Sequence, residues 1–268
     1  MKYNPKRRRS IRGTKAYNNK TFLNSREARN IRIQCEIAEP AVRLKSLGID
    51  HLISFFGSAR TEETNRYYQE GVELAEKLGN WCNEEHPNVA ISSGGGPGIM
   101  EAVNKGAFNA GCPSVGMGIS LPFEQRNNDY VTADLDFEFH YFFTRKYWCV
   151  YLAKAFIAMP GGFGTLDELF EVLTLIQTEK LTIDVPIVLY GKDFWNTVVN
   201  FEALAEHGTI SKDDLKLFKV CDDVDTAYKF IKKNIHLQGD KYYLIYMIDK
   251  FVLPMKIFDL QHNRILYF

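Results

Sequence analysis

Continuous apolar stretches alternate along the chain with segments in which apolar residues recur at helical spacing. The apolar stretches have the length and composition of parallel strands that are buried on both faces, and they cover residues 51–57, 89–92, 114–119, 155–159 and 185–190. The pattern predicts helices over residues 64–78, 141–154, 166–177, 194–207 and 223–233. It predicts a further helix that is opened by the segment 92–102 and ends at residue 110. At least five strand and helix alternations predict a doubly wound α/β fold, with a mainly parallel sheet and helices on both faces.

Three segments fall outside this alternation. Residues 27–47 predict a helix broken at Pro40, with Ile31, Ile33, Ile37, Val42, Leu44 and Leu47 as apolar anchors, which packs outside the sheet or against a partner subunit. Residues 121–138 are irregular and polar, and a connection of this length is often functional. The tail, residues 242–268, is rich in aromatic and β-branched residues, which predicts one or more added strands or an interface segment. We therefore divide the chain into a leader (1–26), a catalytic domain (27–237) and a C-terminal extension (238–268).

Composition narrows the class of protein. Of the 268 residues, 46% are hydrophobic and 25% are charged, as in soluble globular proteins. No apolar run is long enough to span a membrane, and the N-terminal residues lack the apolar part of a secretory signal, so we expect a cytoplasmic protein. The five cysteines are odd in number and scattered, which predicts reduced thiols, and the histidines show no metal-ligand spacing. The sequence therefore predicts no metal site and no cofactor.

The net charge of zero is unevenly distributed. Residues 1–26 carry nine Lys and Arg and no acid, which leaves 24 basic against 33 acidic residues in the rest of the chain. A basic leader of this kind could contact nucleic acid, an anionic surface or the protein's own acidic body, or it could be a solvated tail without a partner. No basic patch interleaved with aromatic residues follows it, which argues against a nucleic-acid partner.

The sequence PGGFGTLDE at residues 160–168 has the form of a strand end, a glycine turn and a helix start. Gly161, Gly162 and Gly164 let backbone N–H groups converge on an anion, and the free N-terminus of a helix favours negative charge. Thr165 is expected to be the N-cap of the helix. Glu168, three residues later, then fits two interpretations: a capping-box glutamate or a functional carboxylate. Neither a GxGxxG nor a GxxxxGK[ST] motif occurs in the chain.

A second glycine-rich turn, SSGGGPGIMEA at residues 92–102, opens another helix. Gly94, Gly95 and Gly96 leave almost no side chain there, so either a ligand approaches the backbone or the turn is merely tight. Both glycine turns follow predicted strands, and ligands of doubly wound sheets bind beyond the carboxyl ends of the strands. Arg145 and Lys146 lie near the start of a helix, where cations oppose the helix dipole. Helix stability therefore does not explain these two residues, which are either functional or surface charges.

Four segments together resemble the LOG (LONELY GUY) family over about residues 50–235: FGSAR, SGGGPGIMEA, TRK and PGGFGTLDE. Members of this family are cytokinin riboside 5'-monophosphate phosphoribohydrolases, often mislabelled as lysine decarboxylases. The resemblance implies a Rossmann-like fold, with Arg145 and Glu168 as catalytic residues. It implies that substrate and phosphate are bound by Ser58, Gly94, Gly95, Gly96, Glu101, Lys146, Gly161, Gly162, Phe163, Gly164 and Thr165. The helix expected before FGSAR makes the chain similar to the longer class of these enzymes.

The resemblance implies hydrolysis of the N-glycosidic bond of AMP or an N6-substituted AMP, giving free base and ribose 5-phosphate. It also implies a homodimer or a higher homo-oligomer with sites near the interface. Two alternatives remain: a general nucleoside 5'-monophosphate nucleosidase, and a non-catalytic nucleotide or cofactor carrier on the same fold. A carrier has no need of both Arg145 and Glu168. Decarboxylation of lysine would require a Schiff-base lysine in a suitable setting, and neither Lys146 nor Lys154 offers one.

Overall fold

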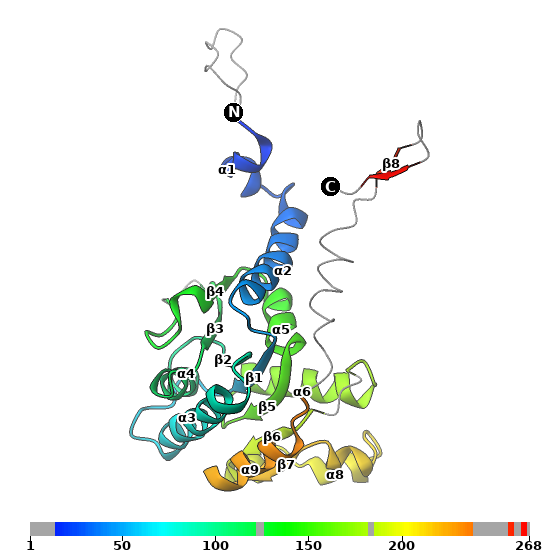
Figure 1. Ribbon diagram of the computed structural model, residues 1–268. Coiled ribbons are helices and arrows are strands. Elements are labelled where there is room, and N and C mark those ends of the chain that lie inside the picture. Colours follow the sequence, from blue (N-terminus) through cyan, green and yellow to red (C-terminus); the bar gives the residue numbers. More distant parts are fainter. Residues whose placement is uncertain (1–13, 122–125, 182–184, 238–256, 260–263, 267–268) are drawn as a thin grey trace.

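The computed structural model describes residues 14–121, 126–181, 185–237, 257–259 and 264–266. A seven-stranded sheet forms the centre of the molecule, and all its strands are parallel, in the order β4-β3-β2-β1-β5-β6-β7 (Figure 1). The strands are β1 His51–Phe56, β2 Val89–Ser93, β3 Ser114–Ile119, β4 Asp136–Phe139, β5 Ala153–Ala158, β6 Ile187–Tyr190 and β7 Lys219–Cys221. The doubly wound parallel fold expected from the sequence is confirmed.

Helices cover both faces of the sheet, as the alternating side chains of β1 require. Ile53 and Phe55 pack with the helices of one face: α3 Arg66–Glu85, α4 Ile99–Asn109 and α9 Val224–Asn234. Leu52 and Phe56 pack with the helices of the other face: α2 Arg29–Ser46, α5 Phe142–Tyr151, α6 Phe163–Gln177, α7 Lys192–Val198 and α8 Phe201–Glu206. The short helix α1 (Lys20–Leu23) and the 3-10 turns Ala16–Asn18, Ala133–Leu135 and Asp213–Lys216 complete the helical elements of the described chain.

The direction of winding reverses between β1 and β5. The chain passes outward from β1 to β4 and returns to β5 on the other side of β1, where Phe56 pairs with Ala158. The N–H of Met159 donates to the carbonyl of Phe56 at 2.8 Å, and the N–H of Ser58 donates to the carbonyl of Pro160 at 3.1 Å. The turns after these two strands therefore lie beside each other, at the place where doubly wound sheets bind ligands.

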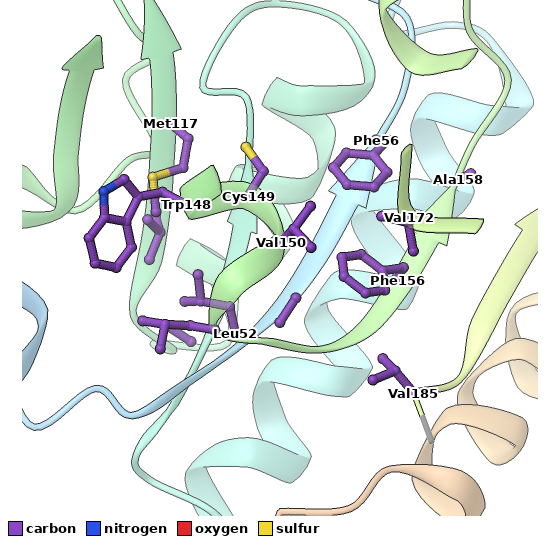
Figure 2. Packing of buried hydrophobic residues seen from close by; sticks show 14 of the residues in the cluster. Leu52, Phe56, Met117, Trp148, Cys149, Val150, Phe156, Ala158, Val172 and Val185 are labelled. Atoms are coloured by element: carbon purple, nitrogen blue, oxygen red, sulfur yellow. The ribbon is translucent and has the colours of Figure 1, made fainter. Parts of the chain in front are cut away.

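Aromatic packing fixes the strands at this reversal. Figure 2 shows the rings of Phe56 and Phe156 on the neighbouring strands β1 and β5, in one cluster with Val150 of α5 and Val172 of α6. The two rings are stacked with their centroids 5.9 Å apart. Full burial of side chains of this size stabilises a fold by about 1.5–3 kcal/mol each, so the core is strongest next to the two turns.

Helix α2 is continuous through Pro40, so the break expected there is wrong. Proline cannot donate a hydrogen bond to the carbonyl four residues earlier, which here belongs to Glu36. The indole Nε1–H of Trp148 in α5 donates to that carbonyl at 2.9 Å and so replaces the missing donor. A tertiary contact thus satisfies the backbone group that would otherwise favour a kink.

Three of the six apolar anchors expected for this segment are exposed. Leu44 is fully buried, whereas Ile31, Val42 and Leu47 are 40, 55 and 44% exposed. Only one side of α2 packs against the rest of the described structure, along α5 and the sheet.

Two strands were not expected from the sequence. Strand β4, Asp136–Phe139, lies at the sheet edge and alternates exposed and buried residues inside the segment that we expected to be irregular. Strand β7 has only three residues, too few for a pattern. The helix expected over 194–207 is instead two helices, because the side chain of Asn200 accepts a hydrogen bond from the N–H of Ala203 and starts α8.

Strands β8 (Ile257–Asp259) and β9 (Arg264–Leu266) form an antiparallel pair in the tail, where added strands were one expectation. Residues 1–13 of the basic leader and most of the tail lie outside the described residues. No helix in the described ranges combines the length and apolarity needed to cross a membrane.

The Trp148 contact gives a test of the continuous helix. Trp148→Phe removes the N–H donor and leaves the Glu36 carbonyl unsatisfied, whereas Pro40→Ala restores a helical donor to that carbonyl. We expect the cost of Trp148→Phe, measured by urea unfolding, to be about 1 kcal/mol smaller in the Pro40→Ala background than in the wild-type chain. Equal costs in both backgrounds would show that the indole N–H does not replace the helical donor.

Candidate functional site

The helix at the PGGFGTLDE segment begins earlier than expected. Gly162 is the N-cap of α6 and Phe163 is its first residue, so Thr165 is not the cap that the sequence suggested. Thr165 is buried and packs directly on Gly161, where a Cβ would collide with its side chain. The N-cap of α6 therefore lies three residues before the expected one, at Gly162 instead of Thr165. Glu168 consequently lies in the second turn of α6, beyond the position of a capping-box glutamate, so that interpretation is excluded.

Glu168 instead forms an ion pair with Arg145 of α5. The Nη2 of Arg145 lies 2.9 Å from Oε1 of Glu168, and the two side chains are only 12 and 11% exposed. The Nε–H of Arg145 also donates to the carbonyl of Met117 in β3 at 2.7 Å. Two helices and one strand therefore fix the pair at the carboxyl edge of the sheet.

Burial dominates the electrostatics of Glu168. Desolvation raises the pKa of its carboxyl above the usual value for glutamate, because the charged form loses its contact with water. The positive charge of Arg145 and its hydrogen bond oppose this shift. A buried carboxylate that has a raised pKa and an ion-pair partner is often found among residues that take part in chemistry.

A cavity of about 420 Å³ opens onto this pair. It brings together the turn after β1, the start of α4, and the first turns of α5 and α6. Of the residues expected from the sequence, it is lined by Ser58, Arg145, Gly162, Phe163, Gly164, Thr165 and Glu168. It is also lined by four residues that were not expected: Gly57, Ala59, Arg60 and Met100. The sequence position of Arg60 could have marked it as a site residue, because it ends the turn that follows the first strand.

The three glycines of the second turn do not line this cavity. A Cβ on Gly94 would lie 2.6 Å from Sδ of Met100 and 2.7 Å from Nη2 of Arg145, and one on Gly96 would lie 2.7 Å from Cε of Met100. Gly95 has a φ of +75°, and a Cβ there would collide with Asn127. The protein's own side chains thus occupy the space above this turn, and Met100 separates it from the cavity.

A buried polar network holds the same turn in place. The side-chain amide of Asn128 donates to the carbonyls of Gly95 and Gly96 at 2.9 and 3.0 Å, and to Oδ1 of Asn104 at 2.9 Å. Asn104 is fully buried, and its own amide donates to Oγ of Ser114 at 2.8 Å. The segment after residue 125, expected to be functional, therefore fastens the glycine turn to the sheet.

Glu101 and Lys146 lie outside the cavity. Oε1 of Glu101 accepts a hydrogen bond from the hydroxyl of Tyr68 at 2.8 Å, and Glu101 lines a separate polar hollow with residues 126–129. Lys146 is ion-paired with Asp167 and Glu171, at 3.0 and 2.6 Å. Both side chains are near the site, yet each is directed to other partners.

The cavity favours an anion. The only charged residues among its lining are Arg60, Arg145 and Glu168, so the lining carries one net positive charge when all three are ionised. The N-terminus of α6 adds free N–H groups and the positive end of a helix dipole.

Nearby thiols and histidines add no further chemistry. Burial raises the pKa of Cys149 to about 12, so its thiol is neutral at physiological pH. All five cysteines are free. The described residues contain no group of three or more His, Cys, Asp or Glu side chains that could hold a metal ion.

Comparison with known proteins identifies a family model and several relatives that this chain resembles. Residues 100–231 match the profile of a family described as "Possible lysine decarboxylase". The chain is 29% identical over 189 residues to the cytokinin riboside 5'-monophosphate phosphoribohydrolase LOG3 of Arabidopsis thaliana, a match that spans 67% of this chain and 79% of LOG3. It is 32% identical over 130 residues to LOG1 of the same plant, which spans 46% of this chain and 58% of LOG1. Over these residues the chain is similar to the LOG family.

Solved structures that are similar to this chain include the molybdenum cofactor carrier protein of Chlamydomonas reinhardtii. That protein is 22% identical, with a TM-score of 0.47, over 69% of this chain and 97% of the carrier. The molybdenum cofactor binding protein of Rippkaea orientalis is 21% identical, with a TM-score of 0.44, over 69% of this chain and 96% of the other.

The two glycine turns of this chain differ in what an added methyl group would meet. Gly94→Ala should displace Met100 or Arg145 and lower the free energy of unfolding by about 1–3 kcal/mol. Gly164 has no atom within 4 Å of its Cβ position and lies inside α6, so Gly164→Ala should leave stability unchanged or raise it by up to about 1 kcal/mol. Denaturant unfolding of both variants measures this difference, and equal losses would contradict the described packing.

Proposed function

We propose that this chain hydrolyses the N-glycosidic bond of a nucleoside 5'-monophosphate, AMP or an N6-substituted AMP, to the free base and ribose 5-phosphate. The observation that carries the proposal is the buried Arg145–Glu168 pair at a cavity that also contains the N-terminus of α6. The relatives named above as phosphoribohydrolases support it.

Cleavage of the bond between the base and C1' develops positive charge on the ribose. In the proposed mechanism the bonding electrons leave with the base, and the oxygen of a water molecule forms the new bond to C1'. The carboxylate of Glu168 stabilises the developing charge and accepts a proton from the attacking water. The departing base takes up one proton and leaves as the neutral free base, and loss of the proton from Glu168 restores the carboxylate. Arg145, held by Glu168 and by the carbonyl of Met117, keeps that carboxylate ionised and oriented.

The phosphate is proposed to bind at the first turn of α6, where Gly162 and Gly164 leave the backbone open. A phosphate held away from the reacting bond supplies binding energy that orients the ribose, which explains a preference for the monophosphate over the free nucleoside. No lysine lines this cavity, so the described site offers no Schiff-base residue for decarboxylation of lysine.

The function is tested by measuring release of free base and ribose 5-phosphate from N6-isopentenyl AMP, AMP, GMP, CMP and UMP. Strong preference for the isopentenyl substrate supports formation of cytokinin bases. Cleavage of the whole panel supports a general nucleosidase. Binding of nucleotide without cleavage of any substrate would contradict the hydrolase and favour a carrier.

Replacement of the carboxylate separates binding from catalysis. Glu168→Gln should lower kcat by about 10²–10⁴-fold, because the neutral amide neither stabilises positive charge nor accepts a proton. Nucleotide affinity, measured by calorimetry, should change little. Asp167→Asn is the matched control, since Asp167 is adjacent in sequence but pairs with Lys146 and is 60% exposed.

The pH profile reports on the same carboxyl group. Activity needs the ionised form, so it should fall as the pH drops, with a midpoint above the usual pKa of an exposed glutamate, because burial raises the pKa of Glu168. Near-normal turnover by Glu168→Gln, or equal losses in Glu168→Gln and Asp167→Asn, would contradict the assigned role.

We also propose that the chain assembles with a second copy of itself. Phe163, at the edge of the cavity, is 92% exposed, and Phe142 and Phe143 at the start of α5 are 56 and 53% exposed. Large apolar side chains that are exposed to solvent are typical of an interface when they form a patch. Light scattering should give the mass of a dimer or a higher oligomer, and a monomer at micromolar concentration would contradict the proposal.

A further inference from the structure

The turn after β1 presents a cation to the cavity, and the ion pairs of the described site do not use it. Arg60 is exposed and lines the cavity together with Gly162, Gly164 and Thr165 of the α6 turn. Its backbone N–H donates to Oγ of Ser58 at 3.0 Å. Within the described part of the chain, the guanidinium of Arg60 forms no ion pair or hydrogen bond.

Hydrogen bonds place the backbone of Arg60 beside the α6 turn. Ser58, two residues before it, donates its N–H to the carbonyl of Pro160 at 3.1 Å and accepts at its carbonyl from the N–H of Ile99 at 2.9 Å. The turn that carries Arg60 is therefore fastened both to the strand end before α6 and to the start of α4. The side chain of Arg60 therefore lines the same cavity as the α6 turn.

The other two cations of this region are engaged. The charge of Arg145 is balanced by Glu168 at 2.9 Å, and Lys146 is balanced by Asp167 and Glu171 and lies outside the cavity lining. The net positive charge of the cavity therefore comes from Arg60. A phosphate monoester carries a charge between −1.5 and −2 at neutral pH, so it needs a cation besides the helix N-terminus.

We propose that Arg60 binds the phosphate group of the substrate, as a specificity residue that distinguishes phosphorylated from unphosphorylated nucleosides. The planar guanidinium can donate two parallel hydrogen bonds to phosphate oxygens, a geometry that lysine cannot reproduce. The identity of the ligand as a nucleoside monophosphate rests on the proposed function. The recognised chemistry, a phosphate monoester at the N-terminus of α6, does not depend on turnover.

Binding of three ligands to Arg60→Ala and Arg60→Lys tests the proposal by calorimetry. Ribose 5-phosphate carries the phosphate without a base, adenosine carries the base without a phosphate, and AMP carries both. Arg60→Ala should weaken ribose 5-phosphate and AMP by about 10- to 100-fold, the usual effect of losing hydrogen bonds to a charged group, and leave adenosine unchanged. Arg60→Lys should recover part of the loss.

Arg26→Ala is the matched control, since Arg26 is also exposed and does not line the cavity. Unchanged affinity of Arg60→Ala for ribose 5-phosphate would overturn the proposal, as would weakened adenosine binding, which would place Arg60 at the base. Failure of the wild-type chain to bind ribose 5-phosphate or AMP would also overturn it. Loss of phosphate binding in a chain that cleaves no nucleotide would instead refute the hydrolase and leave the role of Arg60 standing.

Discussion

The buried ion pair between Arg145 and Glu168 is the interaction on which the geometry of the site depends. Taking a carboxylate and a guanidinium out of water costs several kcal/mol each, and the cost is offset only when the two groups remain close and hydrogen-bonded. The pair joins α5 to α6 and, through the carbonyl of Met117, to β3. These three elements must therefore keep their spacing, or a charge is left buried without its partner.

Helix α2 lies outside the sheet, yet it contributes to this constraint. The carboxylate of its Glu36 accepts hydrogen bonds from the N–H groups of His140 and Tyr141, at 2.9 and 3.3 Å, and from the hydroxyl of Thr144 at 2.5 Å, just before and within the first turn of α5. A negative charge at a helix N-terminus offsets the unfavourable effect that Arg145 and Lys146 have near the same end. Because the carbonyl of Glu36 also accepts from Trp148, one residue of α2 contacts α5 through both its backbone and its side chain.

The sequence predicts the elements whose pattern is local and misses those that depend on a neighbour. Strands β1, β3 and β5 are continuous apolar runs, and their buried faces make them readable. The edge strand β4 was missed because its polar, exposed residues resemble a loop, and only pairing with β3 defines it. The continuity of α2 at Pro40 depends on Trp148, which is 108 residues away in the sequence, so no local rule predicts it.

The candidate site shows the same division. The sequence predicts that Glu168 lies near the start of a helix after a glycine turn. It does not decide between a capping glutamate and a functional carboxylate, because that depends on the residue at which α6 begins. That start is set by the packing of Thr165 on Gly161, a contact between residues close in sequence whose geometry the spacing does not fix. Lys146 follows Arg145 in the sequence but points to Asp167 and Glu171, because adjacent residues of a helix face different directions.

The glycines of the two turns differ in what surrounds them, and the difference supports the ligand-binding face that we propose. At Gly94, Gly95 and Gly96 the missing side chain makes room for Met100, Arg145 and Asn127, so these residues are needed to build the protein itself. At Gly162 and Gly164 no protein atom lies within 4 Å of the Cβ position, so internal packing does not require glycine there. The open backbone supports the proposed approach of a ligand at this turn, where the helix dipole of α6 and the guanidinium of Arg60 both favour an anion.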